Sequence, residues 1–228
     1  MRMDSEKLKL GHISTDEILS GISGRDPIMG ELARRIGYFR LEAGGGYFES
    51  LVQAIVYQQI SGKAAESIYN RFLEKLGGPV TPENIGKLSD EDLRSSGISP
   101  QKIRYLRDLS SKTLSGELDL NGIESMPNSD IVRKLTIVNG IGTWSAQMFL
   151  IFTLGRLNVL PLNDVGFRNA LKKHYSIRGE LTDRKITRIA SKWAPYMSAG
   201  VWILWECENT KLPASSPRER SHVPATEY

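Results

Sequence analysis

The residues of this chain that are best suited to do chemistry are a Gly-x-Gly turn and a single aspartate that follows it. Gly140 and Gly142 stand between two stretches with helical patterns, and Asp164 follows 22 residues after Gly142, behind Pro161. Glycine supplies the positive φ of a tight turn between helices, and its missing side chain lets backbone N–H groups approach an anion closely. A helix that opens at Thr143 would direct the positive end of its dipole at the same anion. The pattern predicts a helix-hairpin-helix element that holds a DNA phosphate backbone without reading the base sequence.

The Gly-x-Gly turn by itself is weak evidence, because any helix that stops at a glycine can produce it. It is not the phosphate-binding fingerprint of dinucleotide-binding proteins, since no predicted strand precedes it and the third glycine is missing. The segments around the turn therefore decide what it binds.

Five segments, the turn among them, occur in the order found in one known family. They read LVQAIVYQQISGKAAESIYNRF, LRSSGISPQKIRYLRDL, VNGIG, LPLNDVG and WAPYMSAGVWILW, at residues 51–72, 93–109, 138–142, 160–166 and 193–205. Together they resemble the helix-hairpin-helix DNA glycosylase superfamily and, within it, the 3-methyladenine DNA glycosylase II type. The resemblance covers residues 48–205.

The resemblance implies an all-α fold, a two-lobed helical bundle with a catalytic cleft between the lobes. We expect an N-terminal helical arm over residues 1–46, a glycosylase domain over residues 47–210, and a disordered tail over residues 211–228, which is rich in Pro, Ser and charge. The residues before the matching region have helical patterns, so we expect a compact version without an N-terminal β-sheet domain. Pocket residues that such a domain would contribute have no counterpart in this chain.

Helix start signals recur along the sequence. Four sites carry a cap residue with an acidic partner or a following proline: Ser14 with Glu17, Asp26 with Pro27, Ser89 with Asp92, and Ser99 with Pro100. A helical period is clear at Leu51, Ala54, Ile55 and Gln58, and again at Ile103, Leu106 and Leu109. We expect about ten short helices. Residues 157–162 are the only strand candidate and fit an extended loop better.

Asp164 is the candidate catalytic residue. Cleavage of the bond between a base and its deoxyribose builds positive charge on the sugar, and a fixed carboxylate near C1′ can stabilise that charge or activate the attacking water. The alternative is that Asp164 only caps a helix over residues 165–173, because Asp is strongly preferred at helix N-caps. The two roles are compatible, and the resemblance places the family's catalytic aspartate on Asp164 rather than on Asn163.

Trp144 bears on strand cutting and on the base pocket. In family members that also cut the DNA strand, a lysine just after the hairpin attacks the sugar. Trp144 occupies the matching position, which implies a monofunctional enzyme without lyase activity. Aromatic faces attract a cationic alkylated purine, and we expect a base pocket formed by Tyr57, Trp144, Met148 and Trp205. The alternative for Trp144 is a place in the core.

Gln59 matches the wedge residue that fills the gap left by a flipped base. A glutamine here departs from the large apolar wedge of some family members. We expect the phosphate contacts at the hairpin and at the next helix start, from Gly140, Gly142, Thr143, Ser61 and Lys63. For Lys63 the alternative is an ordinary solvated helix terminus.

Composition and charge fit these expectations without deciding them. The chain has 228 residues, a net charge of +4 and a pI near 9.1, which suits double-stranded DNA with damaged bases as partner. No apolar run is long enough for a signal peptide or a membrane span. We therefore expect a monomer inside the cell, in the cytoplasm, nucleus or nucleoid, with no membrane contact and no secretion.

Few residues of the sequence could hold a metal or a cofactor. The single cysteine, Cys207, excludes an intrachain disulfide and a four-cysteine iron–sulfur cluster. The three histidines lack ligand spacing, so we expect no catalytic metal and no cofactor. The resemblance implies at most a monovalent ion at the hairpin carbonyls of Val138 and Gly140.

Three functions remain open at this point. The leading one is a monofunctional DNA glycosylase that flips out and hydrolytically excises alkylated purines such as 3-methyladenine, leaving an abasic site in base excision repair. A second is a glycosylase of the same fold that acts on an oxidised or deaminated base. A third is a non-catalytic helix-hairpin-helix DNA-binding module, in which Asp164 is only a cap.

Overall fold

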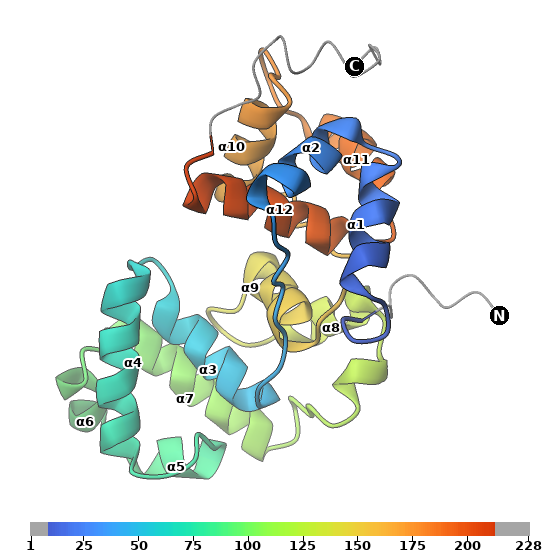
Figure 1. Cartoon of the computed structure of the whole chain (residues 1–228). Coiled ribbons are helices and arrows are strands. Elements are labelled where there is room, and N and C mark those ends of the chain that lie inside the picture. The colour runs from blue at the N-terminus through green and yellow to red at the C-terminus, as the bar shows by residue number, and fades with distance from the viewer. Residues whose placement is uncertain (1–8, 213–228) are drawn as a thin grey trace. The chain divides into compact units, whose positions relative to one another are not determined.

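The computed structural model describes residues 9–212, and its regular structure is helical (Figure 1). The α-helices are α1 (Thr15–Ser23), α2 (Pro27–Ile36), α3 (Tyr47–Tyr57), α4 (Gly62–Leu76), α5 (Pro82–Lys87), α6 (Asp90–Ser95), α7 (Pro100–Leu114), α8 (Asn128–Leu135), α9 (Thr143–Met148), α10 (Val165–His174), α11 (Asp183–Ala190) and α12 (Met197–Asn209). Three short helical turns complete the set, the 3₁₀ turns η1 (Ile123–Ser125) and η3 (Ser191–Trp193) and the π-helical η2 (Phe149–Thr153). The all-α prediction is confirmed for the described residues.

The part of the chain that the structure describes has no β-strand, only one isolated bridge between Lys9 and Arg156. Residues 157–162 form a loop without regular structure, as expected. In the described range no helix is both long enough and apolar enough to cross a membrane. Of the tail predicted to be disordered, residues 211–228, all but the first two lie outside the described residues.

The predicted cap residues begin the helices that follow them. The side chains of Ser14, Asp26, Ser89 and Ser99 accept backbone N–H groups in the first turns of α1, α2, α6 and α7. At α6 the capping box is complete, because the Asp92 carboxylate also accepts the N–H of Ser89 at 3.0 Å. Local side-chain chemistry therefore fixes where these four helices start.

The chain folds into two compact units. Unit 1 contains the described residues up to Glu42 together with those from Gly155 onward, and unit 2 runs from Ala43 to Leu154. In unit 1, α2 packs against α1 and α12, and α10 packs against α12, so helices from both ends of the chain share one core (Figure 1). The existence of a separate N-terminal arm over residues 1–46 stays a prediction.

A buried carboxylate ties the elements of unit 1 together. Asp26 is fully buried and caps α2 by accepting the N–H of Ile28 at 3.1 Å. Its other oxygen accepts the hydroxyl of Tyr175 at 2.6 Å and the indole N–H of Trp193 at 3.0 Å. The Trp193 ring packs edge-on against Phe167 of α10. Because buried polar groups are costly when unpaired, this cluster fixes α2 and η3 against α10.

Unit 2 is organised around α3, which packs against α4, α7 and η2 (Figure 1). Leu51 and Ile55 of α3 are buried, as the helical period predicts. So are Ile103, Leu106 and Leu109 of α7. The helix α8 packs against α9, and the turn between them is the predicted hairpin.

Candidate active site and DNA interface

Asp164 is the N-cap of α10 and lies at the end of a tight turn. Its N–H donates to the carbonyl of Pro161 at 3.0 Å, and its Oδ1 accepts the N–H of Phe167 at 2.6 Å. Only 8 % of the residue is exposed. The predicted cap is therefore confirmed, and it fixes the backbone and the carboxylate of Asp164 together.

Trp205 holds the same carboxylate from a second helix. The indole Nε1–H of Trp205, on α12, donates to Asp164 Oδ1 at 2.9 Å. Gly166 lies beneath this pair, and a Cβ at that position would be 3.4 Å from Asp164 Oδ1 and 3.6 Å from the indole nitrogen. Two donors from different helices thus converge on one oxygen, which orients the carboxylate more tightly than a cap bond alone.

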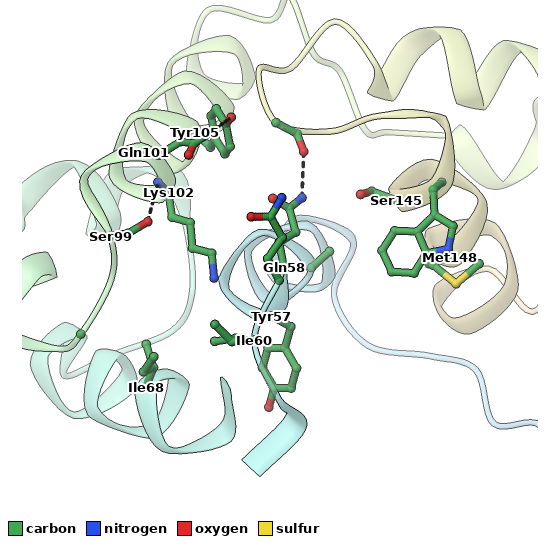
Figure 2. Close-up of a pocket in the computed structure, with 15 residues that line it drawn as sticks. Tyr57, Gln58, Ile60, Ile68, Ser99, Gln101, Lys102, Tyr105, Ser145 and Met148 are labelled. Carbon is green, nitrogen blue, oxygen red and sulfur yellow. Dashed lines mark hydrogen bonds between the residues drawn. The ribbon is translucent and has the colours of Figure 1, made fainter. Parts of the chain in front are cut away.

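The hairpin between α8 and α9 requires glycine at its first position. Gly140 has φ +86°, and a Cβ there would lie 2.2 Å from the ring of Tyr105. The carbonyl of Gly140 accepts the side-chain amide of Gln58 at 2.8 Å (Figure 2). The sequence analysis missed Gln58 and Tyr105, which fix the hairpin against α3 and α7.

A carboxylate of α7 also fixes the hairpin. Asp108 Oδ2 accepts the N–H of Asn139 at 2.7 Å, and both Asp108 oxygens accept the Lys112 ammonium. Burial favours a higher pKa for Asp108, but the hydrogen bonds from Lys112 and Asn139 outweigh it and lower the pKa. The hairpin therefore rests on an ionised carboxylate, and Asn139 contributes no free N–H to a ligand.

The start of α9 has the features predicted for a phosphate site. The helix begins at Thr143 with Gly142 as N-cap, and Gly142 offers no side chain to accept the N–H groups of the first turn. Nothing lies within 4 Å of the position where a Cβ of Gly142 would be. The backbone at Gly142 is thus open to an anion at the positive end of the helix.

A cavity of about 810 Å³ in unit 2 contains three of the four predicted base-pocket residues. Tyr57, Trp144 and Met148 line it, and 44 % of Trp144 is exposed. The alternative that Trp144 lies in the core is therefore wrong. The fourth residue, Trp205, belongs to unit 1, where it contacts Asp164.

The predicted wedge residue occupies a strained turn beside this cavity. Gln59 is exposed and has φ +59°, a left-handed backbone conformation that is unfavourable for residues other than glycine. The carbonyl of Val56, at the end of α3, accepts the Lys102 ammonium at 2.7 Å. In Figure 2, Lys102 reaches from α7 toward this turn. Burial lowers the pKa of Lys102.

The next helix start is exposed. Ser61 is the N-cap of α4 and accepts the N–H of Ala64 at 3.5 Å. Ser61 and Lys63 are both exposed. Their contact with phosphate stays a prediction, because the cap and the exposure fit a solvated helix terminus equally well.

The hairpin carbonyls fit a weakly bound cation at most. Val138 accepts the N–H of Ile141 at 3.0 Å and Gly140 accepts Gln58, so one lone pair of each oxygen is in use. The remaining donor set is neutral carbonyl oxygen, which suits a monovalent ion. Within residues 9–212 no three His, Cys, Asp or Glu side chains form a group that could hold a metal.

The sequence was compared with protein families and with known proteins. Residues 52–196 match the model described as HhH-GPD superfamily base excision DNA repair protein. The DNA-3-methyladenine glycosylase 1 of Schizosaccharomyces pombe is 30% identical over 208 residues, which are 88% of this chain and 91% of that protein.

Solved structures give the same result. A DNA-3-methyladenine glycosidase from Bacillus halodurans superposes with a TM-score of 0.77 at 37% identity and covers 87% of this chain and 93% of its own. The S. pombe 3-methyladenine DNA glycosylase Mag1, in complex with abasic DNA, superposes with a TM-score of 0.76 at 30% identity, over 85% of this chain and 97% of its own. With its hairpin and its capped aspartate, this chain belongs to the HhH-GPD superfamily of base excision DNA repair proteins.

Proposed function

We propose that this protein is a monofunctional DNA glycosylase that excises alkylated purines, such as 3-methyladenine, from double-stranded DNA and leaves an abasic site. The observation that carries the proposal is the Asp164 carboxylate, held at one oxygen by Phe167 N–H and Trp205 Nε1–H. Relatives that align over most of the chain are 3-methyladenine DNA glycosylases, and this supports the choice of lesion.

Asp164 acts on the sugar in this proposal. As the glycosidic bond breaks, positive charge develops at C1′, and a preorganised carboxylate stabilises it without having to reorient. The same carboxylate can accept a proton from the attacking water. Both roles need a fixed position, which the cap and the indole bond supply.

The flipped base binds to aromatic and apolar side chains. Tyr57, Trp144 and Met148 line one cavity, and we assign them to the base together with Trp205. An electron-poor alkylated purine stacks on indole and phenol faces more strongly than a normal base does. Gln59, at its exposed left-handed turn, would fill the gap that the base leaves in the duplex.

The hairpin holds the DNA backbone. We assign the phosphate contacts to the N–H groups of Gly140, Gly142 and Thr143 and to the side chains of Ser61 and Lys63. A monovalent ion at the carbonyls of Val138 and Gly140 would add positive charge at the same place. The protein would act as a monomer on chromosomal DNA, and therefore inside the cell.

A binding module without catalysis is the second candidate, favoured by the confirmed N-cap at Asp164. Base release from methylated duplex DNA separates the two functions. Wild type is expected to release methylpurines without alkali-independent strand breaks. Asp164→Asn should release none, although asparagine caps helices almost as well as aspartate.

The matched control is Asp130→Asn, which removes a partly exposed carboxylate that is paired with Arg133 in unit 2. It should keep full excision. Equal excision by Asp164→Asn would rule out the catalytic role, and DNA binding by wild type without any base release would favour the binding module. Release of an oxidised or deaminated base instead of methylpurines would assign another lesion to the same site.

A further inference from the structure

Three residues of unit 2 link α3 to the N-cap of α4, and the middle one is the wedge residue Gln59. Residues 58–60, which we call the wedge turn, follow Tyr57 at the end of α3 and precede Ser61, the N-cap of α4. Gln59 has φ +59°. A strained backbone of this kind persists only where the surrounding structure holds it, so the contacts on either side of Gln59 decide where its side chain lies.

The first of these contacts is at the end of α3. The last carbonyls of a helix have no partner within it, and Lys102 Nζ donates to one of them, the carbonyl of Val56, at 2.7 Å. An ammonium group there also complements the negative end of the helix dipole. Because Lys102 belongs to α7, α7 fixes the point at which the wedge turn leaves α3.

The second contact joins the wedge turn to the hairpin. Gln58 is the C-cap of α3, and its side-chain amide donates to the carbonyl of Gly140 at 2.8 Å (Figure 2). Gln58 is partly buried, and a hydrogen bond away from solvent is stronger than one in water. The residue directly before Gln59 is therefore attached to the element that we assign to the DNA backbone.

The hairpin peptide that Gln58 contacts is itself fixed. The N–H of Ile141, in the same peptide group as the Gly140 carbonyl, donates to the carbonyl of Val138 at 3.0 Å. Gly140 also lies so close to the Tyr105 ring that there is no room for a Cβ. A shift of the hairpin would therefore break the bond to Gln58 or move the wedge turn with it.

We propose that Gln58 is a positioning residue that places the wedge residue Gln59 relative to the DNA backbone bound by the hairpin. This inference rests on the proposed glycosylase function and adds a residue to it. Gly142, which we assign to a phosphate, is two residues from Gly140, whose carbonyl accepts Gln58. The phosphate bound by the hairpin and the gap filled by Gln59 are then a fixed distance apart. A misplaced Gln59 would fill the gap poorly and leave the flipped state less stable.

The first experiment compares two duplexes with a single 7-methylguanine, one with cytosine opposite the lesion and one with an abasic site opposite it. With cytosine, Gln58→Met should lower the single-turnover excision rate about tenfold, the equivalent of one lost hydrogen bond. Opposite an abasic site the lesion has no base pair to lose, so filling the gap contributes less, and the rate should fall less than about twofold. Equal losses on the two duplexes would overturn the proposal, because they would mean that Gln58 only supports the fold.

Two further variants serve as comparisons. The control Gln53→Met makes the same change at an exposed residue of α3 and should excise like wild type on both duplexes. Gln58→Glu keeps the size and polarity of the side chain but replaces the amide donor with an acceptor. It should show the same dependence on the opposite base as Gln58→Met, and a wild-type rate opposite cytosine in Gln58→Glu would overturn the proposal.

The second experiment tests whether Gln58 acts through Gln59. Gln59→Ala alone should lower the rate opposite cytosine about tenfold. Adding Gln58→Met should lower it no further, because the side chain to be positioned is then absent. Losses that multiply in the double variant would overturn the proposal.

Flipping is measured separately from excision, by the fluorescence of a 2-aminopurine placed beside the lesion. The proteins used also carry Asp164→Asn, which is expected to stop base release. Gln58→Met should reduce the fluorescence rise opposite cytosine and leave it unchanged opposite an abasic site. Flipping that depends on Gln58, without any excision by wild type, would overturn the glycosylase function and support the positioning role. Excision by wild type with no effect of Gln58→Met would overturn the positioning role alone.

Discussion

The indole of Trp205 and the carboxylate of Asp164 form one hydrogen-bonded pair, with Nε1 at 2.9 Å from Oδ1. The same oxygen caps α10, so the side chain that would stabilise charge on the sugar is part of a helix terminus. A residue 41 positions away in the sequence fixes its orientation. The pair makes the role of Trp205 testable apart from stacking on a base.

Trp205→Phe keeps an aromatic ring on α12 and removes the donor to Asp164. Because hydrogen bonds to charged groups contribute about 1.5 to 3 kcal/mol, we expect the single-turnover excision rate to fall about 10- to 100-fold. Quenched-flow or manual single-turnover assays on methylated duplex measure the change. A wild-type rate in Trp205→Phe would show that the indole N–H has no part in orienting the carboxylate.

The hydrogen bond between Trp205 and Asp164 should also contribute to the free energy of unfolding. A double-mutant cycle with Asp164→Ala and Trp205→Phe is expected to give a coupling of about 1.5 to 3 kcal/mol in the free energy of unfolding, as for other hydrogen bonds to a charged group. Urea denaturation of the four proteins provides it. Additive effects would mean that the bond contributes nothing to the folded state.

The two hairpin glycines should respond differently to alanine. Gly140→Ala places a Cβ 2.2 Å from Tyr105 at φ +86°, and we expect a loss of about 2 to 4 kcal/mol in unfolding free energy, because ring and backbone must both shift. Gly142→Ala has φ −93° and open space around the new Cβ. It should lose only about 1 kcal/mol, as for an alanine N-cap, but should bind DNA more weakly.

Urea denaturation and fluorescence anisotropy with an abasic-site duplex distinguish the two glycine variants. If Gly142→Ala binds DNA with wild-type affinity at several salt concentrations, the backbone at that position does not contact phosphate. A stable Gly140→Ala would contradict the tight contact with Tyr105.

No covalent intermediate is expected during excision. Trp144 occupies the position at which a lysine would attack the sugar, so borohydride should trap no adduct between the protein and lesion-containing DNA. Denaturing gels with labelled duplex detect such an adduct. Its appearance would require a nucleophile elsewhere and would contradict the monofunctional assignment.

His174 should make unit 1 less stable in acid. Burial lowers the pKa of His174 below its ordinary value of 6.5, against the opposing effect of Glu208. At a pH between the two pKa values, His174 is therefore protonated in the unfolded chain and neutral in the folded chain. The stability due to neutral His174 is complete above pH 6.5 and decreases as the pH falls below it.

The measurement is the free energy of unfolding between pH 7 and pH 5, for wild type and His174→Gln. The variant should show a shallower decrease, and a single group accounts for at most about 1.4 kcal/mol per pH unit. Glu208, whose pKa is lowered mainly by the hydrogen bond from Lys173, titrates below this range and does not obscure the comparison. Parallel curves for the two proteins would show that His174 titrates normally.

The sequence predicted those features that depend on neighbouring residues. Caps at Ser14, Asp26, Ser89 and Ser99, the turn at Gly140 and the cap at Asp164 all follow from side chains within a few positions of the backbone they hold. The helix starts and the hairpin could be predicted from the sequence for that reason.

Features made by distant residues were not predicted. Gln58 holds the Gly140 carbonyl from 82 positions away, and Asp26 accepts Trp193 from 167 positions away. Neither side chain has a local partner that would distinguish it from a surface glutamine or a simple cap. Tyr105 is one residue of a predicted helix, and nothing near it in the sequence indicates that its ring contacts Gly140.

The division of the chain affects the order in which it can fold during synthesis. Unit 2 is continuous, and all of its residues are synthesised before those of α10, α11 and α12. The apolar side chains of α1 and α2, such as Ile22 and Leu32, are buried in the finished protein, yet α12, against which α2 packs, is translated after every other helix of the described residues. The side of α2 that packs on α12 must therefore stay uncovered until α12 has been synthesised, a period in which chaperones or aggregation compete with folding.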